Sequence, residues 1–285
     1  MSIVIFRPSV AILCLSLLHS TQLLGTNVMV NEYWNSNGGP SRGSKMARNE
    51  FIEFVIVEAT SAAELAAMTF GDTNNGTSKL NSVFTFDLAT LDSALAGASL
   101  TQFLPGTIIV VKGTGLGAQD LGYDPFSNTN DGWKIELVAG QGALDHPETV
   151  IDGNFSIDST GDVVWISSGN PPANDTDTSG FIHAIGHDTN PGLIATTVAA
   201  AFGAENIVQS SLGTNRGFSN VGGATEVLAS STSTTMGVAN SGANAAWITT
   251  NRLLAVPEPQ RVGLMALGVL GALIRRKRNF HPRHG

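Results

Sequence analysis

The sequence predicts an all-β domain over residues 26–250, and two observations lead to this prediction. Short runs of β-branched and aromatic residues alternate with clusters of Gly, Asn, Asp and Pro, which is the pattern of strands separated by turns. The same region is poor in charge and rich in Gly, Ser, Thr, Asn and Ala. It has no internal repeat and one low-complexity patch, rich in Ser and Thr, at 229–235. We therefore expect a single β domain with long loops.

The expected strands share β-branched or aromatic residues and are bounded by turn residues. They are Val28–Trp34, Phe51–Glu58, Met68–Phe70, Val83–Phe86, Thr107–Lys112, Lys134–Val138, Val163–Ser167, Phe181–Ile185, Glu226–Leu228 and Ala246–Thr249. Two stretches have helical composition, Ser61–Ala67 and Pro191–Phe202, and we expect them to cross the ends of a sandwich.

The most informative strand is Asn49–Glu58. Alternate residues of a strand share a face, so Ile52, Phe54 and Ile56 lie on one side and Glu53 lies on the other with further apolar residues. A strand that is apolar on both faces is expected in the middle of a sandwich. Glu53 then needs hydrogen-bond partners or an exposed position.

Several short motifs resemble the lamin-tail domain. They are Val30-Asn31-Glu32, Asn49-Glu50-Phe51-Ile52-Glu53-Phe54, Leu65–Asp72, Leu104-Pro105-Gly106-Thr107 before an apolar strand, Gly161-Asp162-Val163-Val164-Trp165-Ile166, and Asn240–Asn244. The sequence departs from the family where Met68 replaces a tryptophan and where Thr73–Asn81 and Gly113–Asp131 form long inserts. The resemblance implies an immunoglobulin-like β-sandwich that serves in binding or attachment and has no catalytic residues.

The C-terminal end combines three features in order: Val256-Pro257-Glu258-Pro259, an apolar run of 13 residues from Val262 to Ile274, and a basic cluster at 275–278. Prolines stop a helix, and the basic residues Arg275, Arg276, Lys277 and Arg278 act as a stop signal on the cytoplasmic side. As a helix the apolar run measures about 20 Å, against about 30 Å for a bilayer core. It is a marginal membrane span, and the alternative is a buried core helix with a solvated basic end.

These residues resemble the PEP-CTERM sorting signal of Gram-negative bacteria. The resemblance implies export, temporary retention in the inner membrane, and processing near Pro257-Glu258-Pro259 by an exosortase, a membrane cysteine transpeptidase. It also implies an organism that makes exopolysaccharide. The departure from the pattern is the trailing segment Asn279–Gly285, expected to be a cytoplasmic tail.

The N-terminal end complements this signal. Arg7 precedes an apolar run, Val10–Leu18, that has the length of a signal-peptide core and is too short to span a membrane. The alternative is an N-terminal strand of the fold. We assign 1–25 to a signal peptide, 26–250 to the β domain, 251–260 to a linker, 261–278 to the membrane helix with its stop signal, and 279–285 to the tail. Cys14 is the only cysteine, so the exported protein has none.

The charge of the exported body is strongly negative. Seven of the 15 basic residues lie in the predicted signal peptide or after Pro259, so eight remain against 23 acidic residues, a net charge of −15. Such a surface repels phosphate backbones and makes nucleic acid an unsuitable partner. It favours solubility and contact with divalent cations.

Few residues indicate chemistry. His183 and His187 stand four apart beside Asp188, but the glutamate of a zinc helix is missing and Gly186 favours a strand that ends in a turn. We expect exposed histidines at a strand end, about 13 Å apart. Three Asx-rich loops resemble calcium loops in composition, without the full spacing, through Asp72 and Asn74, Asn130 and Asp131, and Asp175 and Asp177.

The expected function is therefore non-enzymatic, with no cofactor beyond a structural calcium ion. The hypothesis is a structural or adhesive protein of the extracellular matrix that contacts exopolysaccharide or surface proteins. Aromatic residues are candidates for stacking on sugars, with core packing as the alternative: Tyr33, Trp34, Tyr123, Phe126, Trp133 and Trp165. The competing class is a secreted hydrolase with a metal or carboxylate site, for which no paired carboxylates stand at a diagnostic spacing.

Overall fold

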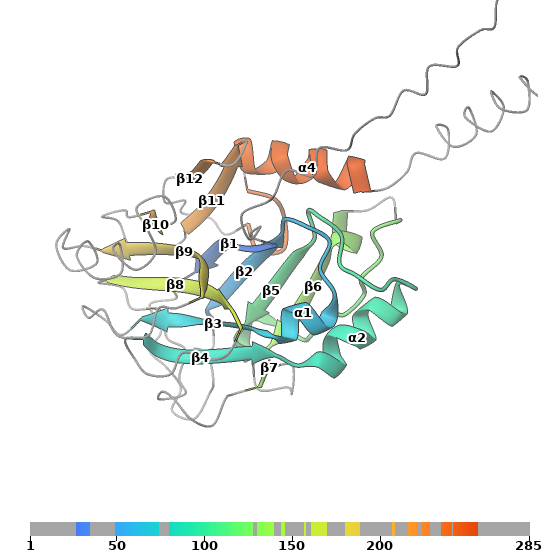
Figure 1. Ribbon diagram of the computed structural model, residues 1–285, viewed down its shortest axis with the longest axis horizontal. Coiled ribbons are helices and arrows are strands. Elements are labelled where there is room, and N and C mark those ends of the chain that lie inside the picture. Colours follow the sequence, from blue (N-terminus) through green and yellow to red (C-terminus); the bar gives the residue numbers. More distant parts are fainter. Residues whose placement is uncertain are drawn as a thin grey trace, which may run out of the picture.

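Two six-stranded sheets dominate the described part of the chain in a computed structural model, which confirms the all-β prediction (Figure 1). The structure describes residues 27–34, 49–73, 80–127, 130–139, 144–145, 157, 161–169, 180–188, 207–208, 216–221, 224–228, 235–240 and 242–255. The expected signal peptide, the sorting signal with its membrane helix, and the expected helix Pro191–Phe202 lie outside these residues.

The first sheet has the strand order β12 (Ala224–Leu228), β11 (Arg216–Val221), β1 (Val28–Trp34), β2 (Phe51–Ile56), β5 (Ile108–Lys112), β6 (Lys134–Val138). The second has the order β10 (Ile207–Val208), β9 (Phe181–Asp188), β8 (Gly161–Ser168), β3 (Met68–Thr73), β4 (Leu80–Phe86), β7 (Leu144–Asp145). Neighbouring strands run antiparallel except β5 with β6 and β9 with β10, which are parallel.

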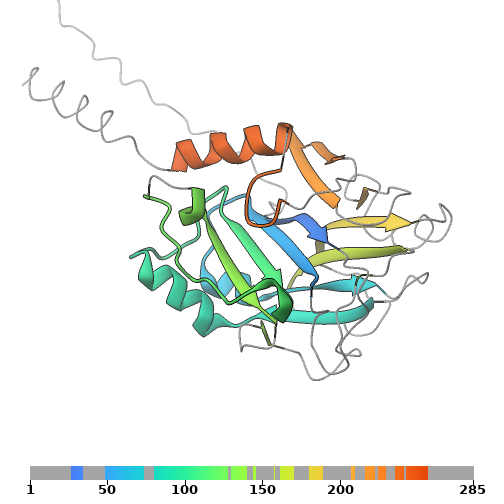
Figure 2. The ribbon, with the colours of Figure 1, turned by 180° about the vertical axis from the view of Figure 1, so that it is seen from behind.

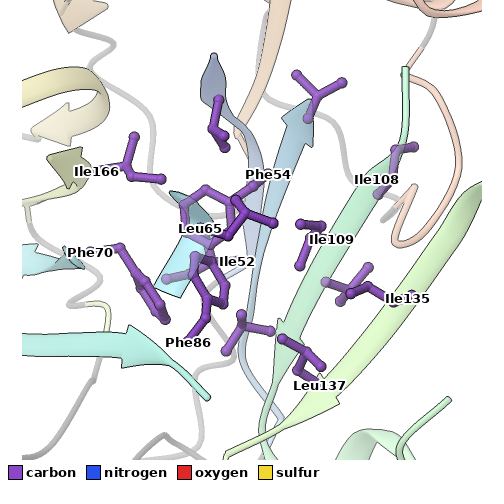
Figure 3. Close-up of a cluster of buried hydrophobic side chains, with 14 of the residues drawn as sticks. Ile52, Phe54, Leu65, Phe70, Phe86, Ile108, Ile109, Ile135, Leu137 and Ile166 are labelled. Atoms are coloured by element: carbon purple, nitrogen blue, oxygen red, sulfur yellow. The ribbon is translucent and has the colours of Figure 1, made fainter. Parts of the chain in front are cut away.

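The core between the sheets is built from large side chains of both. The ring of Phe54 on β2 lies 5.1 Å from that of Phe70 on β3 and 5.6 Å from that of Phe86 on β4, both in edge-to-face geometry. Figure 3 shows these rings together with Ile52 and Ile166 in one buried cluster. The face of β2 that carries Ile52 and Phe54 is thus the face toward the second sheet, as the alternation predicts.

Most expected strands are present with boundaries that differ by a few residues. β11 was not predicted, because its sequence, Arg-Gly-Phe-Ser-Asn-Val, has three turn-forming residues and little apolar material. The strand expected at Ala246–Thr249 is wrong. These residues lie within helix α4 (Ala243–Ala255), where Asn244 and Ile248 are buried four residues apart on one face. A β-prone stretch thus becomes helical because the longer segment packs one helical face on the sandwich.

Two further helices lie together at the far side of the molecule from α4 (Figure 1; Figure 2). The predicted helix at Ser61–Ala67 is confirmed as α1 (Ala62–Ala66), whose N-cap Ser61 and Glu64 form a reciprocal capping box. Helix α2 (Leu88–Gly97) was not predicted, although Asp87 caps it by accepting from the Thr90 amide at 2.7 Å.

Helix α4 runs along the first sheet near β11 and ends at Ala255 (Figure 2). Its last five residues, 251–255, were expected to belong to the linker, so the folded body extends further toward the C-terminus. Among the described residues, no helix has the length and apolar character needed to cross a membrane.

Candidate functional site

Two glutamates stand side by side in the middle of the first sheet. Glu32 on β1 is the register partner of Glu53 on β2, and both side chains are buried. A β-bulge interrupts the register between Val30 and Glu32. Glu53 points away from the core face of β2 and toward the segment that precedes α4.

Glu53 finds the hydrogen-bond partners that its burial demands. The Asn31 side-chain amide donates to Oε1, and the backbone N–H of Gly237 donates to Oε2 at 2.7 Å. Gly237 has φ of +76°, and a Cβ there would lie 3.0 Å from Cδ of Lys134, so the chain needs glycine to pass this close.

Glu32 is held by the same C-terminal segment. The backbone N–H of Thr235 donates to Glu32 Oε1 at 3.2 Å, and the Thr235 hydroxyl donates to Oε2. Both carboxylates thus bind the protein's own chain about 200 residues downstream, at 235–237. They fix residues 235–240 to the outer face of the sheet.

Two asparagines extend the network into α4. The Asn244 amide donates to Asn31 Oδ1 at 2.6 Å, and Asn244 Oδ1 accepts from the Asn240 backbone at 3.0 Å. The Asn240 side chain donates to the Asn31 carbonyl at 3.3 Å. We call Asn31, Glu32, Glu53, Thr235, Gly237, Asn240 and Asn244 the Glu53 network. It connects β1, β2, the 235–240 segment and the first turn of α4.

The electrostatics of the network favour a bound proton. Burial raises the pKa of Glu53 well above 4.5, and the nearby charge of Glu32 raises it further, while the bonds from Asn31 and Gly237 lower it by less. Two adjacent buried carboxyl groups cannot both ionise cheaply, so the pair holds a proton at pH values where a solvated glutamate has lost it.

Arg252 secures the other end of α4. Its Nε donates to the Gly106 carbonyl at 2.9 Å, and its guanidinium lies 5.4 Å from the ring centroid of Trp133. Burial lowers the Arg252 pKa to about 10, so the group is cationic at neutral pH. The turn Leu104–Thr107 brings Gly106 against the helix with φ of +88°.

A small ion cluster borders the network at the edge formed by β5 and β6. Lys112 binds one carboxylate oxygen of Glu136, and Lys134 Nζ lies 3.0 Å from the other and 3.4 Å from Asp131. Burial raises the Glu136 pKa, but the bonds to both lysines outweigh this and lower the pKa below 4.5. This side of the site is therefore ionised, in contrast to Glu53.

The histidine prediction is wrong for His183, which is fully buried on β9 rather than exposed at a strand end. Its Nδ1 accepts from the Val30 backbone N–H at 3.1 Å. Val30 is on β1 but is not one of the two β1 residues, Glu32 and Tyr33, that pair with β11. Burial lowers the pKa of His183 to about 3, so the ring is neutral. His187 follows on the same strand, with its side chain outside the described residues.

The residues expected in calcium loops fall in different settings. Asp72 is buried in β3, where its carboxylate accepts from the Ser82 hydroxyl. Asp131 is exposed and pairs with Lys134. Asn74, Asp175, Asp177 and the Asn130 side chain lie outside the described residues. Within the described part of the chain, no three His, Cys, Asp or Glu residues gather in a way that could hold a metal ion.

Core packing accounts for most of the aromatic residues considered for sugar stacking. Tyr33, Tyr123, Trp133 and Trp165 are buried, so the stacking interpretation is wrong for them. Trp165 donates its indole N–H to the Asp72 carbonyl at 3.1 Å, and the Tyr123 hydroxyl accepts from the Leu104 amide at 3.0 Å. Trp34 is half-buried, and Phe126 is 52% exposed.

Sequence reasoning identified Glu53 as a residue in need of partners but missed what supplies them. The signal was present in the Asn-Glu pair at 31–32 and in Asn240 and Asn244, which had been noted separately as family-like motifs. No family model, curated protein or solved structure matches this chain.

Proposed function

We propose that the protein is an exported envelope or matrix protein whose folded body is a non-enzymatic, immunoglobulin-like sandwich of the lamin-tail kind, followed by a PEP-CTERM sorting signal. The observation that carries this proposal is the end of the body. The described part of helix α4 reaches Ala255, and Val256-Pro257-Glu258-Pro259 is the next stretch of the sequence. A processing site has to lie outside a folded core, because a protease needs extended, accessible backbone.

The way in which α4 is attached also supports a folded body that is tethered through its C-terminal end. The Glu53 network and the Arg252 contacts hold the helix at both ends, so a pull on the tail is transmitted to the middle of the first sheet. Pro257 and Pro259 cannot continue the helix, which favours an extended processing site beyond it. A body held in this way suits a protein tethered through its C-terminal end.

The use of the buried carboxylates supports a structural role. A hydrolase of the alternative class needs a pair of carboxyl groups that reach a substrate. Glu32 and Glu53 are register partners on β1 and β2, but they accept hydrogen bonds from Thr235 and Gly237 of the same chain. In the described structure they position the C-terminal segment, and a substrate would have to displace residues 235–240.

Attachment to exopolysaccharide or to surface proteins is the proposed role of the displayed sandwich. Because four of the six aromatic residues considered for stacking are in the core, this role does not depend on an aromatic strip. It would use the polar loops rich in Asn, Thr and Gly. The exosortase and the inner membrane are the proposed transient partners.

The test is fractionation of the producing cells with peptide mapping of the mature C-terminus. The wild-type protein is expected to lose the peptides that follow the Pro-Glu-Pro motif, while Glu258→Ala retains them and stays in the inner membrane. Gln260→Ala is the matched control, because it alters the same segment outside the motif. An intact C-terminus on wild-type protein in a soluble fraction would refute the proposal.

A further inference from the structure

Helix α4 places its charge inward and its largest apolar side chains outward. Arg252, its one charged residue, packs on Gly106 and Trp133. The next two residues are exposed, Leu253 by 68% and Leu254 by 74%. These are the most exposed of the large hydrophobic side chains in the described residues. This arrangement is the reverse of an ordinary surface helix, whose charged residues face water.

The whole outward face of α4 lacks charge. Its exposed residues recur every three or four positions and so form one stripe: Ala246, Thr249, Thr250, Leu253 and Leu254. The polarity changes along this stripe from small and hydroxyl-bearing residues to leucines at the end nearest the tail. The end that points toward the C-terminal segment is therefore the apolar one.

The position of these leucines in the chain identifies what could cover them. Six residues, 256–261, separate α4 from the apolar run that begins at Val262. Fully extended, six residues reach about 20 Å. If the run lies in a membrane, as the proposed function states, the last turn of α4 is held within that distance of the lipid surface.

We propose that the last turn of α4 lies on the surface of the inner membrane and inserts Leu253 and Leu254 among the lipid chains. Residues that are apolar on one face of a helix bind at the headgroup boundary in this manner. The contact orients the sandwich, with α4 against the membrane and helices α1 and α2 on the far side (Figure 1). It also brings Pro257-Glu258-Pro259 to the membrane surface, where a membrane-embedded protease acts. This inference rests on the proposed function.

The experiment measures lipid contact at single positions in the full chain. Cys14→Ser removes the native thiol, and single cysteines are then introduced as Leu254→Cys, Leu88→Cys and Leu270→Cys. Each variant carries an environment-sensitive fluorophore and is reconstituted in vesicles of phosphatidylethanolamine with a minority of phosphatidylglycerol. Lipids that carry a quencher in the acyl chain report contact. Leu88, exposed by 43% at the start of α2, is the matched control on the opposite side.

The expected result is strong quenching at 270 and 254, several-fold greater than at 88. Quenching at 270 with none at 254 overturns this inference and leaves the membrane tether intact. Absence of quenching at 270 refutes the tether itself, and with it the inference. If the 254 probes instead quench one another as protein density rises, a second copy covers the leucines and the lipid contact is wrong.

A second measurement tests whether the two leucines make the contact, with circular dichroism of each variant as the check that the body stays folded. Leu253→Gln with Leu254→Gln is expected to release α4 from the vesicle surface, so that a probe at Thr250→Cys loses its quenching several-fold. The tail probe at 270 is expected to stay quenched. Unchanged quenching at 250 in this variant contradicts insertion of the leucines.

Discussion

The backbone N–H of Gly237 donates to the carboxylate of Glu53 at 2.7 Å, and this bond joins positions 184 residues apart in the chain. Because Glu53 points out of the sheet, the bond holds the C-terminal segment over the outer face of β2. The inner face of β2 packs on Phe70 and Phe86. Every residue of β2 is consequently buried, and the strand lies in the middle layer of the protein.

Removal of the Glu53 carboxylate is expected to be costly. Glu53→Ala leaves the Gly237 N–H and the Asn31 amide without their acceptor, at about 1–3 kcal/mol for each buried group that stays unpaired. We expect a loss of about 2–4 kcal/mol in the free energy of unfolding, measured by urea denaturation. Glu64→Ala, at an exposed helix cap, is the comparison and is expected to lose about 1 kcal/mol or less. Equal losses for the two variants would contradict the role of the network.

The pH dependence of stability gives a separate test of the Glu53 proton. Its pKa is raised in the folded protein, so between 4.5 and that higher value the folded state keeps a proton that the unfolded state has lost. The corresponding stability is complete below pH 4.5 and is lost as the pH rises through the folded pKa. Glu53→Gln cannot titrate. The unfolding free energy of wild type minus that of this variant is therefore expected to fall as the pH rises. A constant difference would show that Glu53 is ionised in the fold.

His183 is expected to act in the opposite direction. Its pKa falls from 6.5 to about 3 on folding, so below pH 6.5 the unfolded state binds a proton that the folded state refuses. Stability is lost as the pH falls from 6.5, by up to about 1.4 kcal/mol per pH unit. His183→Asn keeps an acceptor for the Val30 N–H and removes the titration. We expect the melting temperature of this variant to fall less steeply than that of wild type as the pH drops below 6.5. An equally steep fall would contradict the burial of a neutral ring.

Two glycines with nearly the same φ test how α4 is seated. Gly106 and Gly169 have φ of +88° and +90°, but only at Gly106 would a Cβ meet the helix, 2.9 Å from Arg252 Cγ and 3.0 Å from the Ile248 carbonyl. Both Gly→Ala variants carry a conformational cost of about 1–2 kcal/mol. Gly106→Ala adds overpacking of about 1–3 kcal/mol. Its α4 amides are expected to exchange hydrogen faster than those of Gly169→Ala, and equal exchange would show that α4 does not depend on this contact.

Gly237 and Gly242 form a similar pair within the C-terminal segment. Both have positive φ, of +76° and +70°, but a Cβ at Gly242 meets nothing within 4 Å whereas one at Gly237 lies 3.0 Å from Lys134. We expect Gly237→Ala to lower stability more than Gly242→Ala. It is also expected to widen the pH range over which the Glu53 stability is lost, because the N–H bond that lowers the Glu53 pKa is displaced. Matching denaturation curves for the two variants would contradict this.

The strands that the sequence predicted well are those whose local pattern and tertiary role agree. β1 and β6 have the expected boundaries because each carries β-branched or aromatic residues between turn residues. Residues 246–249 of α4 were predicted as a strand because Trp247, Ile248 and Thr249 favour β structure locally. Packing of Asn244 and Ile248 on the sandwich decides the matter, and no local pattern records it.

By itself the sequence determined the all-β class and the apolar faces of β2, and it established that Glu53 would need partners. Those properties follow from alternation along one strand and from the cost of burying a charge. Only the tertiary structure decided that the partners are Asn31 and Gly237, that Glu32 is the neighbour, and that His183 is buried. Each of these depends on contacts between residues far apart in the chain, which form only when both sheets and the C-terminal segment are assembled.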